Sequence, residues 1–477
     1  MLTNYQIKQG YDEMMKASGN PRSHYESIHQ QLNQFTMEDC KSRHELAQMS
    51  FLRRGISFTV YDDKEQGTER TMPFDFVPNI IPREEWSRIE KGLIQRVRAL
   101  NAFLEDVYGE QQILHDGIVP RDLVVNNPYF CHQIAQPNYA NRNHIFLAGI
   151  DLIRDQHGEY LILEDNLRNP SGLSYVFQNR YCMRKVFPEM FQNYSVRSID
   201  NQFSYLFTAL EELAPKQKSN PRIVLLSPGI FNSAYFDHSF LAQQIGIELV
   251  EGRDLLVQDR KVYMKTTKGL KQVDVIYRRI DDEYLDPLEF RADSMLGVPG
   301  LVDANRAGNV SILNGIGNGV ADDKALYSYV PSIIRYYLNE DPILNNVKTY
   351  ILTDPEQREY VLEHINELVV KPVDGSGGYD ILIGPHASEE KLEIFRQNII
   401  NKPHSYIAQP TISLSTCPTF CNEGFAGRHI DLRPFVIMGK TPRVIPGGLT
   451  RVALKEGSLI VNSSQGGGGK DTWILDY

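Results

Sequence analysis

Two carboxylates and an amide could form a metal site within residues 144–168, HIFLAGIDLIRDQHGEYLILEDNLR. Two apolar runs flank the polar segment DQHGE, which predicts a β-hairpin with the dipeptide HG in its turn. In that register Asp151 faces Glu164, and Asn166 lies on the same face, two residues further along the strand. Oxygen ligands of this kind suit Mg²⁺, and the alternative is a pair of solvated carboxylates on an exposed sheet face.

A lysine and a glycine-rich loop could bind phosphate in ELVVKPVDGSGGYDILIGP, residues 367–385. Valine-rich flanks predict two strands, and Lys371 lies at the end of the first. The residues between the strands are Asp374, Gly375, Ser376, Gly377 and Gly378. Backbone N–H groups of such a loop can approach an anion that Lys371 also reaches. The alternative is a flexible surface hairpin with a solvated lysine.

Two arginines end the strand that VDVIYRRIDD, residues 273–282, predicts. Arg278 and Arg279 could mark an anion site, or they could be surface charges paired with Asp281 and Asp282. Both interpretations stay open at this point.

Two other glycine-rich segments do not match established phosphate-binding motifs. In the tail GGGGK, Lys470 is followed by aspartate where a P-loop needs serine or threonine. The segment GIGNG, residues 315–319, lacks the third glycine of a dinucleotide fingerprint. What remains is Lys324, Lys371, the glycine-rich loop and the oxygen cluster, a set that fits nucleoside triphosphate binding between two β-rich lobes.

Several elements must position these residues. The first hundred residues read as largely helical, with a helix over 37–54 and a longer one starting at Pro82. Residues 222–256 alternate strand, helix and strand, which predicts a βαβ unit and a small parallel sheet. The last third, residues 347–477, reads as mostly strand.

Bulk composition limits the class of protein. The chain has 477 residues and a formal net charge of −10, so we expect about three domains and no general nucleic-acid binding. Five scattered cysteines do not suggest a disulfide framework, and no apolar run is long enough to span a membrane. These features predict a cytoplasmic protein without nucleic-acid or membrane partners and leave the oligomeric state open.

Taken together, the motifs resemble the ATP-grasp superfamily in its circularly permuted type 2 branch, which is related to glutathionylspermidine synthase. The matching segments are PSGLSYVFQNR, PGIFNSAYFDHSFLAQQIGIELVEGRDL, VIYRRIDD, VVKPVDGSGGYDILIGP, HIDLRPFVIMG and VNSSQGGGGKDTWIL. The resemblance implies an α/β protein with α+β elements. Its fold would be a circularly permuted ATP-grasp with a helical N-terminal region and a small parallel-sheet βαβ domain.

The resemblance also implies a division of the chain. Residues 1–110 would form the helical region, and 111–215 the permuted ATP-grasp segment with the metal hairpin. Residues 216–320 would form the βαβ substrate domain. Residues 321–477 would carry the phosphate lysines, the glycine-rich loop and the adenine hinge.

Roles for individual residues follow from the same resemblance. Asp151, Glu164 and Asn166 would bind Mg²⁺. ATP would be bound by Lys324, Lys371, Gly375, Ser376, Gly377, Gly378, Ile407, Ala408 and Gln409. Within this set the lysines contact the phosphates, the loop folds over them, and residues 407–409 offer backbone groups to adenine. Arg168, Ser171 and Arg433 would contact phosphate or the acyl intermediate.

One departure from the family pattern affects the chemistry. Glutathionylspermidine synthases have an arginine two residues before the metal aspartate, where this chain has Gly149. The acyl-phosphate contact must then come from elsewhere. The implied reaction is ATP-dependent ligation of a small-molecule or peptide carboxylate to an amine through an acyl phosphate. The alternatives are phosphoryl transfer without ligation and a nucleotide-binding scaffold that has lost turnover.

Overall fold

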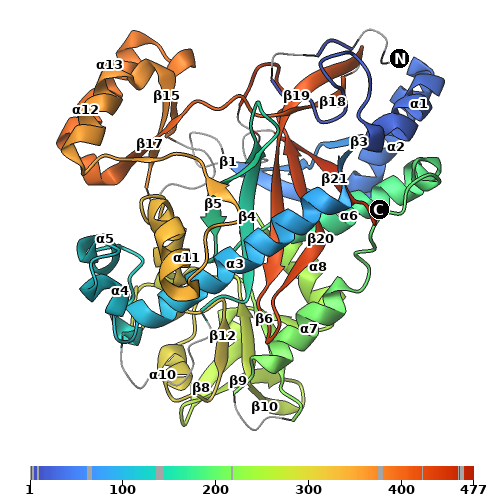
Figure 1. Ribbon diagram of the computed structural model, residues 1–477. Helices are drawn as coiled ribbons and strands as arrows, with labels where there is room; N and C mark the ends of the chain where they lie inside the picture. The colour runs from blue at the N-terminus through green and yellow to red at the C-terminus, as the bar shows by residue number, and fades with distance from the viewer. Residues whose placement is uncertain are drawn as a thin grey trace.

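A large mixed sheet forms the centre of this computed structural model (Figure 1). The structure describes residues 2, 5–7, 10–61, 67–135, 144–215, 219–373, 380–421, 423–459, 461 and 467–476, without side chains for 59–61 and 67–68. The sheet order is β13-β5-β4-β19-β20-β21-β3, and β18 pairs with β19. Its strands are β3 (Phe74–Ile81), β4 (Leu147–Arg154), β5 (Tyr160–Asn166), β13 (Asn345–Asn346), β18 (Thr416–Cys421), β19 (Gly424–Ile437), β20 (Arg443–Val452) and β21 (Gly468–Ile474).

Helices cover both faces of the large sheet. The long helix α3 (Arg83–Val107) packs on one face, and α6 (Leu173–Val186) packs on the other. Every residue of β4 is buried, which explains why its sequence reads as a nearly continuous apolar run. Ile150 and Leu152 belong to the core that contains α3, so Asp151 between them points to the opposite face.

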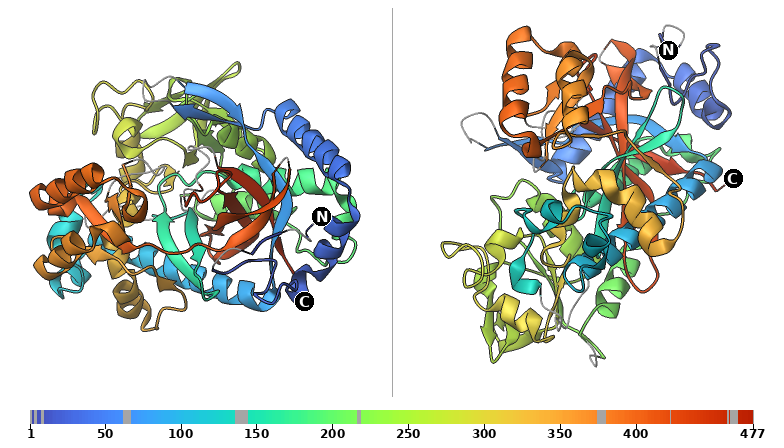
Figure 2. Two further views of the ribbon diagram at one scale, coloured as in Figure 1. Left: turned by 90° about the horizontal axis from the view of Figure 1, so that it is seen from above. Right: turned by 60° about the vertical axis from the view of Figure 1, so that its left-hand side comes forward.

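A smaller lobe carries the sequence-predicted lysine strand. Its sheet has the order β14-β17-β15-β16 and consists of β14 (Tyr350–Ile351), β15 (Leu368–Pro372), β16 (Leu382–Ile383) and β17 (Tyr406–Pro410). Helices α12 (Pro355–Glu363) and α13 (Glu389–Asn401) complete a separate hydrophobic core with this sheet. In Figure 1 the lobe lies at the upper left and the parallel sheet described next lies at the bottom, and the view from above in Figure 2 shows that the lobe is offset to one side.

The predicted βαβ unit forms a parallel sheet in the order β12-β11-β6-β7. Its elements are β6 (Ile223–Leu226), α8 (Tyr235–Ile245), β7 (Glu248–Val250), β11 (Val275–Arg278) and β12 (Ser311–Leu313). An antiparallel sheet, β10-β9-β8, is inserted between β7 and β11 and comprises β8 (Leu255–Gln258), β9 (Lys261–Thr266) and β10 (Gly269–Val273). The carboxyl ends of the parallel strands therefore lie along one edge, the usual position of ligand sites in such sheets.

Shorter elements fill the remaining described chain. They are α1 (Glu26–Gln34), α2 (Met37–Arg53), β1 (Ser57–Tyr61), β2 (Gly67–Thr71), α4 (Gln112–His115), α5 (Arg121–Val125), α7 (Gln202–Glu212), α9 (Asp282–Leu285), α10 (Leu301–Arg306) and α11 (Val330–Leu338). The helix predicted over 37–54 is confirmed, and Thr36 caps it together with Asp39.

The structure adds two details to the predicted elements and corrects one. The first hundred residues also contain β1, β2 and β3, and the last third contains α12 and α13. Pro82 is the N-cap of α3 and not its first helical residue. The predicted domain boundaries stay a prediction. The large sheet takes strands from three of the four proposed segments.

Candidate active site

The hairpin β4–β5 has the predicted register at the candidate metal site but a different turn. Asp151 pairs with Glu164, as predicted. At the far end Arg154 pairs with Tyr160, so residues 155–159 form a longer turn than the expected dipeptide. A register shift directly after Asp151 accommodates one extra residue of β5 and restores the predicted pairing. Gly149 pairs with Asn166 beyond this bulge.

Two arginines from neighbouring strands bind the carboxylate of Asp151. Arg433 donates from Nε and Nη2 to its two oxygens, at 2.5 and 2.8 Å. Arg451 donates from Nη2 at 2.7 Å and also bonds to Asp431 through Nε at 2.9 Å. The four groups form an alternating chain of charges across β4, β19 and β20. Sequence reasoning missed Asp431 and Arg451, and the available signal is a charged residue next to apolar ones within a strand, which is rarely buried unless it is paired.

This arrangement determines whether the two aspartates of the network are ionised. Burial opposes ionisation of Asp151, but Arg433 and Arg451 outweigh it and hold the pKa of Asp151 below its usual range. Burial raises the pKa of Asp431 even though Arg451 binds it. Asp151 is therefore a carboxylate at neutral pH, as a metal ligand must be.

Arg433 occupies the space above Gly149. A β-carbon added at Gly149 would lie 3.2 Å from Cδ of Arg433 and 3.0 Å from Pro170. An arginine side chain at position 149 could not share this space. Arg433 of β19 thus fills the space beside Gly149, on the same face of the hairpin as Asp151.

Glu164 and Asn166 extend the oxygen cluster beyond Asp151. The Glu164 side chain is 31% exposed, and its carboxylate lies 3.9 Å from Nη2 of Arg433. Two carboxylates and an amide on one face fit Mg²⁺, which keeps its remaining positions for water and phosphate. Asp165 points to the other face and forms a buried ion pair with Arg96 at 2.6 Å, so it has a structural role.

Lys371 comes toward this cluster from the smaller lobe. Its Nζ donates to Oε1 of Gln409 at 2.8 Å, and Gln409 donates in turn to Oγ1 of Thr349 at 3.0 Å. Burial lowers the pKa of Lys371 to about 8, with Lys324 also lowering it and Glu164 opposing the shift. Lys324 and Glu164 are thus near enough to Lys371 for their charges to act on it.

Lys324 is anchored to the end of the lysine strand. Its backbone N–H donates to the carbonyl of Val373 at 3.4 Å, which joins the segment after β12 to β15. The preceding residue, Asp323, accepts from the backbone N–H of Ala325 at 2.7 Å and from Nδ2 of Asn127 at 2.9 Å. The turn that presents Lys324 is therefore held by its own Asp323 and by two other segments of the chain, at Val373 and Asn127.

The predicted adenine hinge lies within β17, at the centre of its sheet. Ile407 pairs with both Ile351 and Lys371, and Ala408 also has a partner on each side. Backbone groups in a central strand are largely used by its neighbours. The Gln409 side chain holds Lys371, and a backbone contact between residues 407–409 and adenine stays a prediction.

Arg168 and Ser171 lie in the segment that follows β5. Nε of Arg168 donates to Asp322 at 2.8 Å, and its guanidinium lies 4.2 Å from the ring centre of Tyr129. The carbonyl of Ser171 accepts from Nη1 of Arg433 at 3.4 Å. The structure thus brings Ser171 to the cluster through its backbone, while Arg168 is engaged by Asp322, a residue that sequence reasoning did not select.

Other site predictions lie outside the described chain or find no counterpart in it. Gly375, Ser376, Gly377 and Gly378 lie outside the described residues. Within the described ranges, no three His, Cys, Asp or Glu side chains converge as a metal site, and the predicted set relies on an asparagine as its third ligand. None of the helices described there has the length and hydropathy needed to cross a bilayer.

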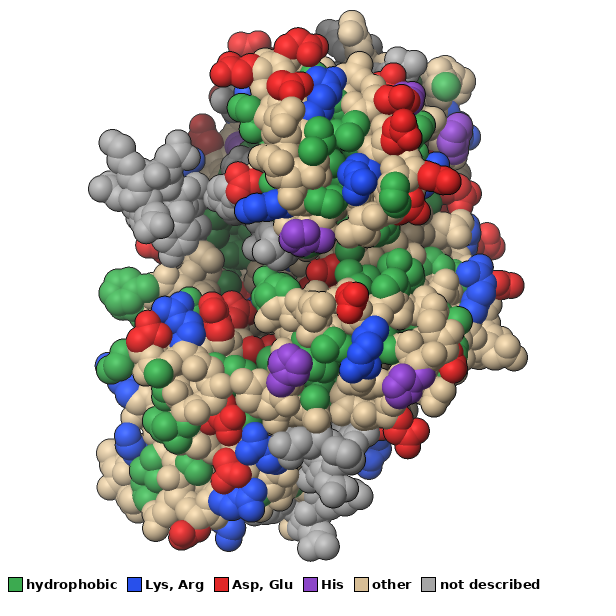
Figure 3. Space-filling model, turned by 90° about the vertical axis from the view of Figure 1, so that its left-hand side faces the viewer, with side chains coloured by type: hydrophobic (Ala, Val, Ile, Leu, Met, Phe, Trp, Pro, Cys, Tyr) green, Lys and Arg blue, Asp and Glu red, His purple; other side chains and the backbone are tan. Residues whose placement is uncertain are grey.

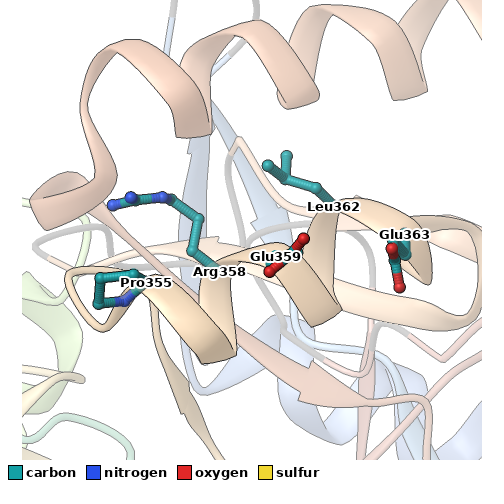
Figure 4. Close-up of a pocket in the computed structure, with 5 residues that line it drawn as sticks. All are labelled: Pro355, Arg358, Glu359, Leu362 and Glu363. Carbon is teal, nitrogen blue, oxygen red and sulfur yellow. The ribbon is translucent and has the colours of Figure 1, made fainter.

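The molecular surface adds little to this site. A shallow pocket of about 440 Å³ is lined by α12 residues alone, and no predicted site residue contributes to it (Figure 4). Its lining residues are Pro355, Arg358, Glu359, Leu362 and Glu363. On the face shown in Figure 3, acidic and basic side chains are interspersed.

Comparison with known proteins assigns the family. The sequence profile of circularly permuted ATP-grasp type 2 proteins matches residues 78–453. The chain therefore belongs to this family, and its mixed α/β architecture with a parallel sheet agrees with the fold that the resemblance implied. In the solved structure of a glutathione synthetase-like effector from Globodera pallida, the same fold covers 93% of this chain and 98% of that one, with a TM-score of 0.59 and 12% identity.

Relatives of known sequence extend over the whole chain. An uncharacterised protein of Mycobacterium tuberculosis is 52% identical across 98% of this chain and 84% of its own length. An uncharacterised protein of Synechocystis is 50% identical across 99% and 98%. A Frankia casuarinae protein, provisionally named glutamate–cysteine ligase 2-2, is 42% identical across 99% of this chain. The chain spans only 54% of that longer relative.

Proposed function

We propose that this protein is an ADP-forming carbon–nitrogen ligase that joins a carboxylate to an amine at the expense of ATP. Membership in the ATP-grasp family and the provisional name of the Frankia relative support an ATP-dependent ligase. The observation that carries the proposal is the convergence of Lys371, Lys324, Glu164 and Asp151: the backbone N–H of Lys324 donates to Val373 at the end of the Lys371 strand, Asp151 pairs with Glu164, and the charges of Glu164, Lys324 and Asp151 act on Lys371. Positive groups for phosphates thus meet oxygen ligands for a metal.

The residues divide the work as follows. Lys324 and Lys371 bind the phosphates of ATP and stabilise charge on the transferring phosphoryl group. Asp151, Glu164 and Asn166 would hold Mg²⁺, which offsets the negative charge of the phosphates when bound. The guanidinium of Arg433 lies beside these carboxylates and binds the acyl phosphate, the function that Gly149 cannot supply. Arg168 and Ser171 orient the reacting groups from the segment after β5.

The proposed reaction has two steps. The substrate carboxylate attacks the γ-phosphorus of ATP, which releases ADP and gives an acyl phosphate. The amine nitrogen then attacks the acyl carbon, phosphate leaves with the bonding electron pair, and the ammonium that forms loses a proton. The glycine-rich loop would exclude water from the intermediate during this sequence. The co-substrates are a small-molecule or peptide carboxylate and an amine.

Product analysis tests this proposal. The wild-type protein is incubated with Mg²⁺, ATP and each carboxylate of a panel in turn. Every reaction also contains hydroxylamine, which traps an acyl phosphate as a hydroxamate. We expect ADP and hydroxamate in equal amounts, and loss of both with Lys371→Ala. A stable phosphorylated product would instead indicate a phosphotransferase, and nucleotide binding without ADP formation across the panel would indicate a scaffold.

A further inference from the structure

A second polar cluster lies at the carboxyl edge of the parallel sheet, apart from the phosphate lysines. It is centred on Arg279, directly after β11, and includes Asp237 from α8 and the segment 169–174 after β5. The interpretation of Arg278 and Arg279 as surface charges is wrong, because both are buried. Arg278 donates to the carbonyls of Asn314, Ile280 and Gly315 and forms an ion pair with Asp282.

Arg279, in contrast, makes only long contacts and leaves part of its hydrogen-bonding capacity unused. Its contacts are the Tyr277 hydroxyl at 3.4 Å, the Asn169 carbonyl at 3.4 Å and the Asp237 carboxylate at 3.5 Å. Its Nε has no hydrogen-bond partner among the described residues, although the side chain is only 1% exposed. A buried guanidinium normally makes short, well-directed hydrogen bonds, because its desolvation is costly.

Its neighbours share this lack of partners. Within the described chain, no hydrogen bond reaches Oγ of Ser174, Oδ2 of Asp237 or Oδ1 of Asn169. Nδ2 of Asn169 donates to Asp281 at 2.8 Å, which fixes the amide orientation and leaves its oxygen as the free group. Oδ1 of Asp237 accepts from the backbone N–H of Ser174 at 2.8 Å, which keeps the cluster in place. Two donors without hydrogen bonds, on Arg279 and Ser174, thus occur in one cluster with two acceptors without hydrogen bonds, of which Oδ2 of Asp237 has only the ion-pair contact with Arg279 at 3.5 Å.

We propose that this cluster binds the α-amino-acid head group of a substrate, an inference that rests on the proposed ligase function. The substrate's carboxylate accepts from Arg279 and Ser174. Its ammonium donates to Asp237 and Asn169. This pairing satisfies all four free groups and gives the ligand's carboxylate a cationic partner and its ammonium an anionic one, whereas a neutral ligand would leave the long Arg279–Asp237 ion pair, at 3.5 Å, as the compensation of these two charges.

The position of the cluster suits such a role. The segment that carries Asn169 and Ser174 begins directly after Asn166, and its Ser171 carbonyl accepts from Arg433. One stretch of chain therefore connects the proposed metal ligands to the head-group site. Ligands of parallel α/β sheets bind outside the carboxyl ends of the strands, where Arg279 lies.

Titration calorimetry with the common L-amino acids, in the presence of Mg²⁺ and the ATP analogue AMP-PNP, tests the inference. At least one amino acid should bind the wild-type protein, and its N-acetyl and amide derivatives should bind at least tenfold more weakly. Ser174→Ala should weaken binding several-fold, and Arg279→Lys and Asp237→Asn at least tenfold. All three variants should bind AMP-PNP like the wild type. Ser174→Ala removes only an unpaired hydroxyl and should fold normally.

Three results would overturn the inference. The first is that wild-type protein binds AMP-PNP but no amino acid. The second is that the blocked derivatives bind as tightly as the free amino acid. The third is that the three variants bind the amino acid as tightly as Arg260→Lys, a surface control. In each case the four atoms hold only water. Failure of AMP-PNP to bind would count against the proposed ligase instead. The amino-acid titration would then be repeated without nucleotide to test the head-group site by itself.

Discussion

Arg433 engages both carboxylate oxygens of Asp151, and Arg451 shares one of them. Asp151 is thus both the centre of a buried ion network and a proposed metal ligand. Removing its charge would leave the buried guanidinium of Arg451 and the mostly buried one of Arg433 without their common partner. We expect Asp151→Asn to lower the free energy of unfolding by about 3–5 kcal/mol, measured by equilibrium urea unfolding.

An exposed pair provides the control for this loss. Asp341 binds Arg335 with its side chain 89% exposed, so Asp341→Asn should change the same free energy by less than about 0.5 kcal/mol. Similar losses in the two variants would contradict a special role for the buried network.

Adjacent acidic residues on β5 should behave in opposite ways. Glu164 faces the lysines, whereas Asp165 pairs with Arg96 in the core. We expect Glu164→Gln to reduce the rate of ADP formation about 100-fold and to raise the Mg²⁺ concentration required, with little change in stability. Asp165→Asn should destabilise the protein by about 3–5 kcal/mol, as for other broken buried pairs, and leave AMP-PNP affinity intact. Reversed effects would show that the faces are misassigned.

Nucleotide affinity should depend on pH through Lys371. The free protein has a Lys371 pKa of about 8, so this lysine is charged below that pH and neutral above it. Only the charged form attracts phosphate, so AMP-PNP affinity should fall as pH rises through 8, and binding at pH 8.5 should take up protons. Calorimetry in two buffers of different ionisation enthalpy measures this uptake. Lys371→Arg should bind AMP-PNP with an affinity that does not depend on pH in this range. If the pH dependence persists in that variant, another titrating group causes it.

The close approach of Arg433 to Gly149 predicts the effect of a single methyl group. Gly149→Ala would push against Arg433 and Pro170, at 3.2 and 3.0 Å, and disturb the bonds to Asp151. We expect a loss of about 1–3 kcal/mol of stability and weaker hydroxamate formation. Gly447 on β20 has its nearest neighbour at 3.7 Å, so Gly447→Ala is the matched control and should be nearly neutral. A tolerated Gly149→Ala would show that Arg433 can adopt another position.

Local sequence patterns predicted the hairpin and the lysine strand because their partners are nearby in the chain. The pairing of Asp151 with Glu164 was correct even though the turn was longer than expected, since a bulge in β5 compensated for it. Arg451 and Asp431 were missed because the strands that carry them meet β4 only in the folded sheet. The interpretation of Arg279 as a surface charge was wrong for the same reason. Its partner Asp237 lies on a different element, α8, and meets it only in the folded protein.

The strand order of the large sheet has a consequence for biosynthesis. The partners of Asp151, Arg433 and Arg451, lie 282 and 300 residues further along the chain and are synthesised later. At about 5–20 residues per second, a ribosome needs many seconds to supply them. During that interval β4 and β5 exist without β19 and β20. The ion network around Asp151 can therefore form only after β20 has been synthesised.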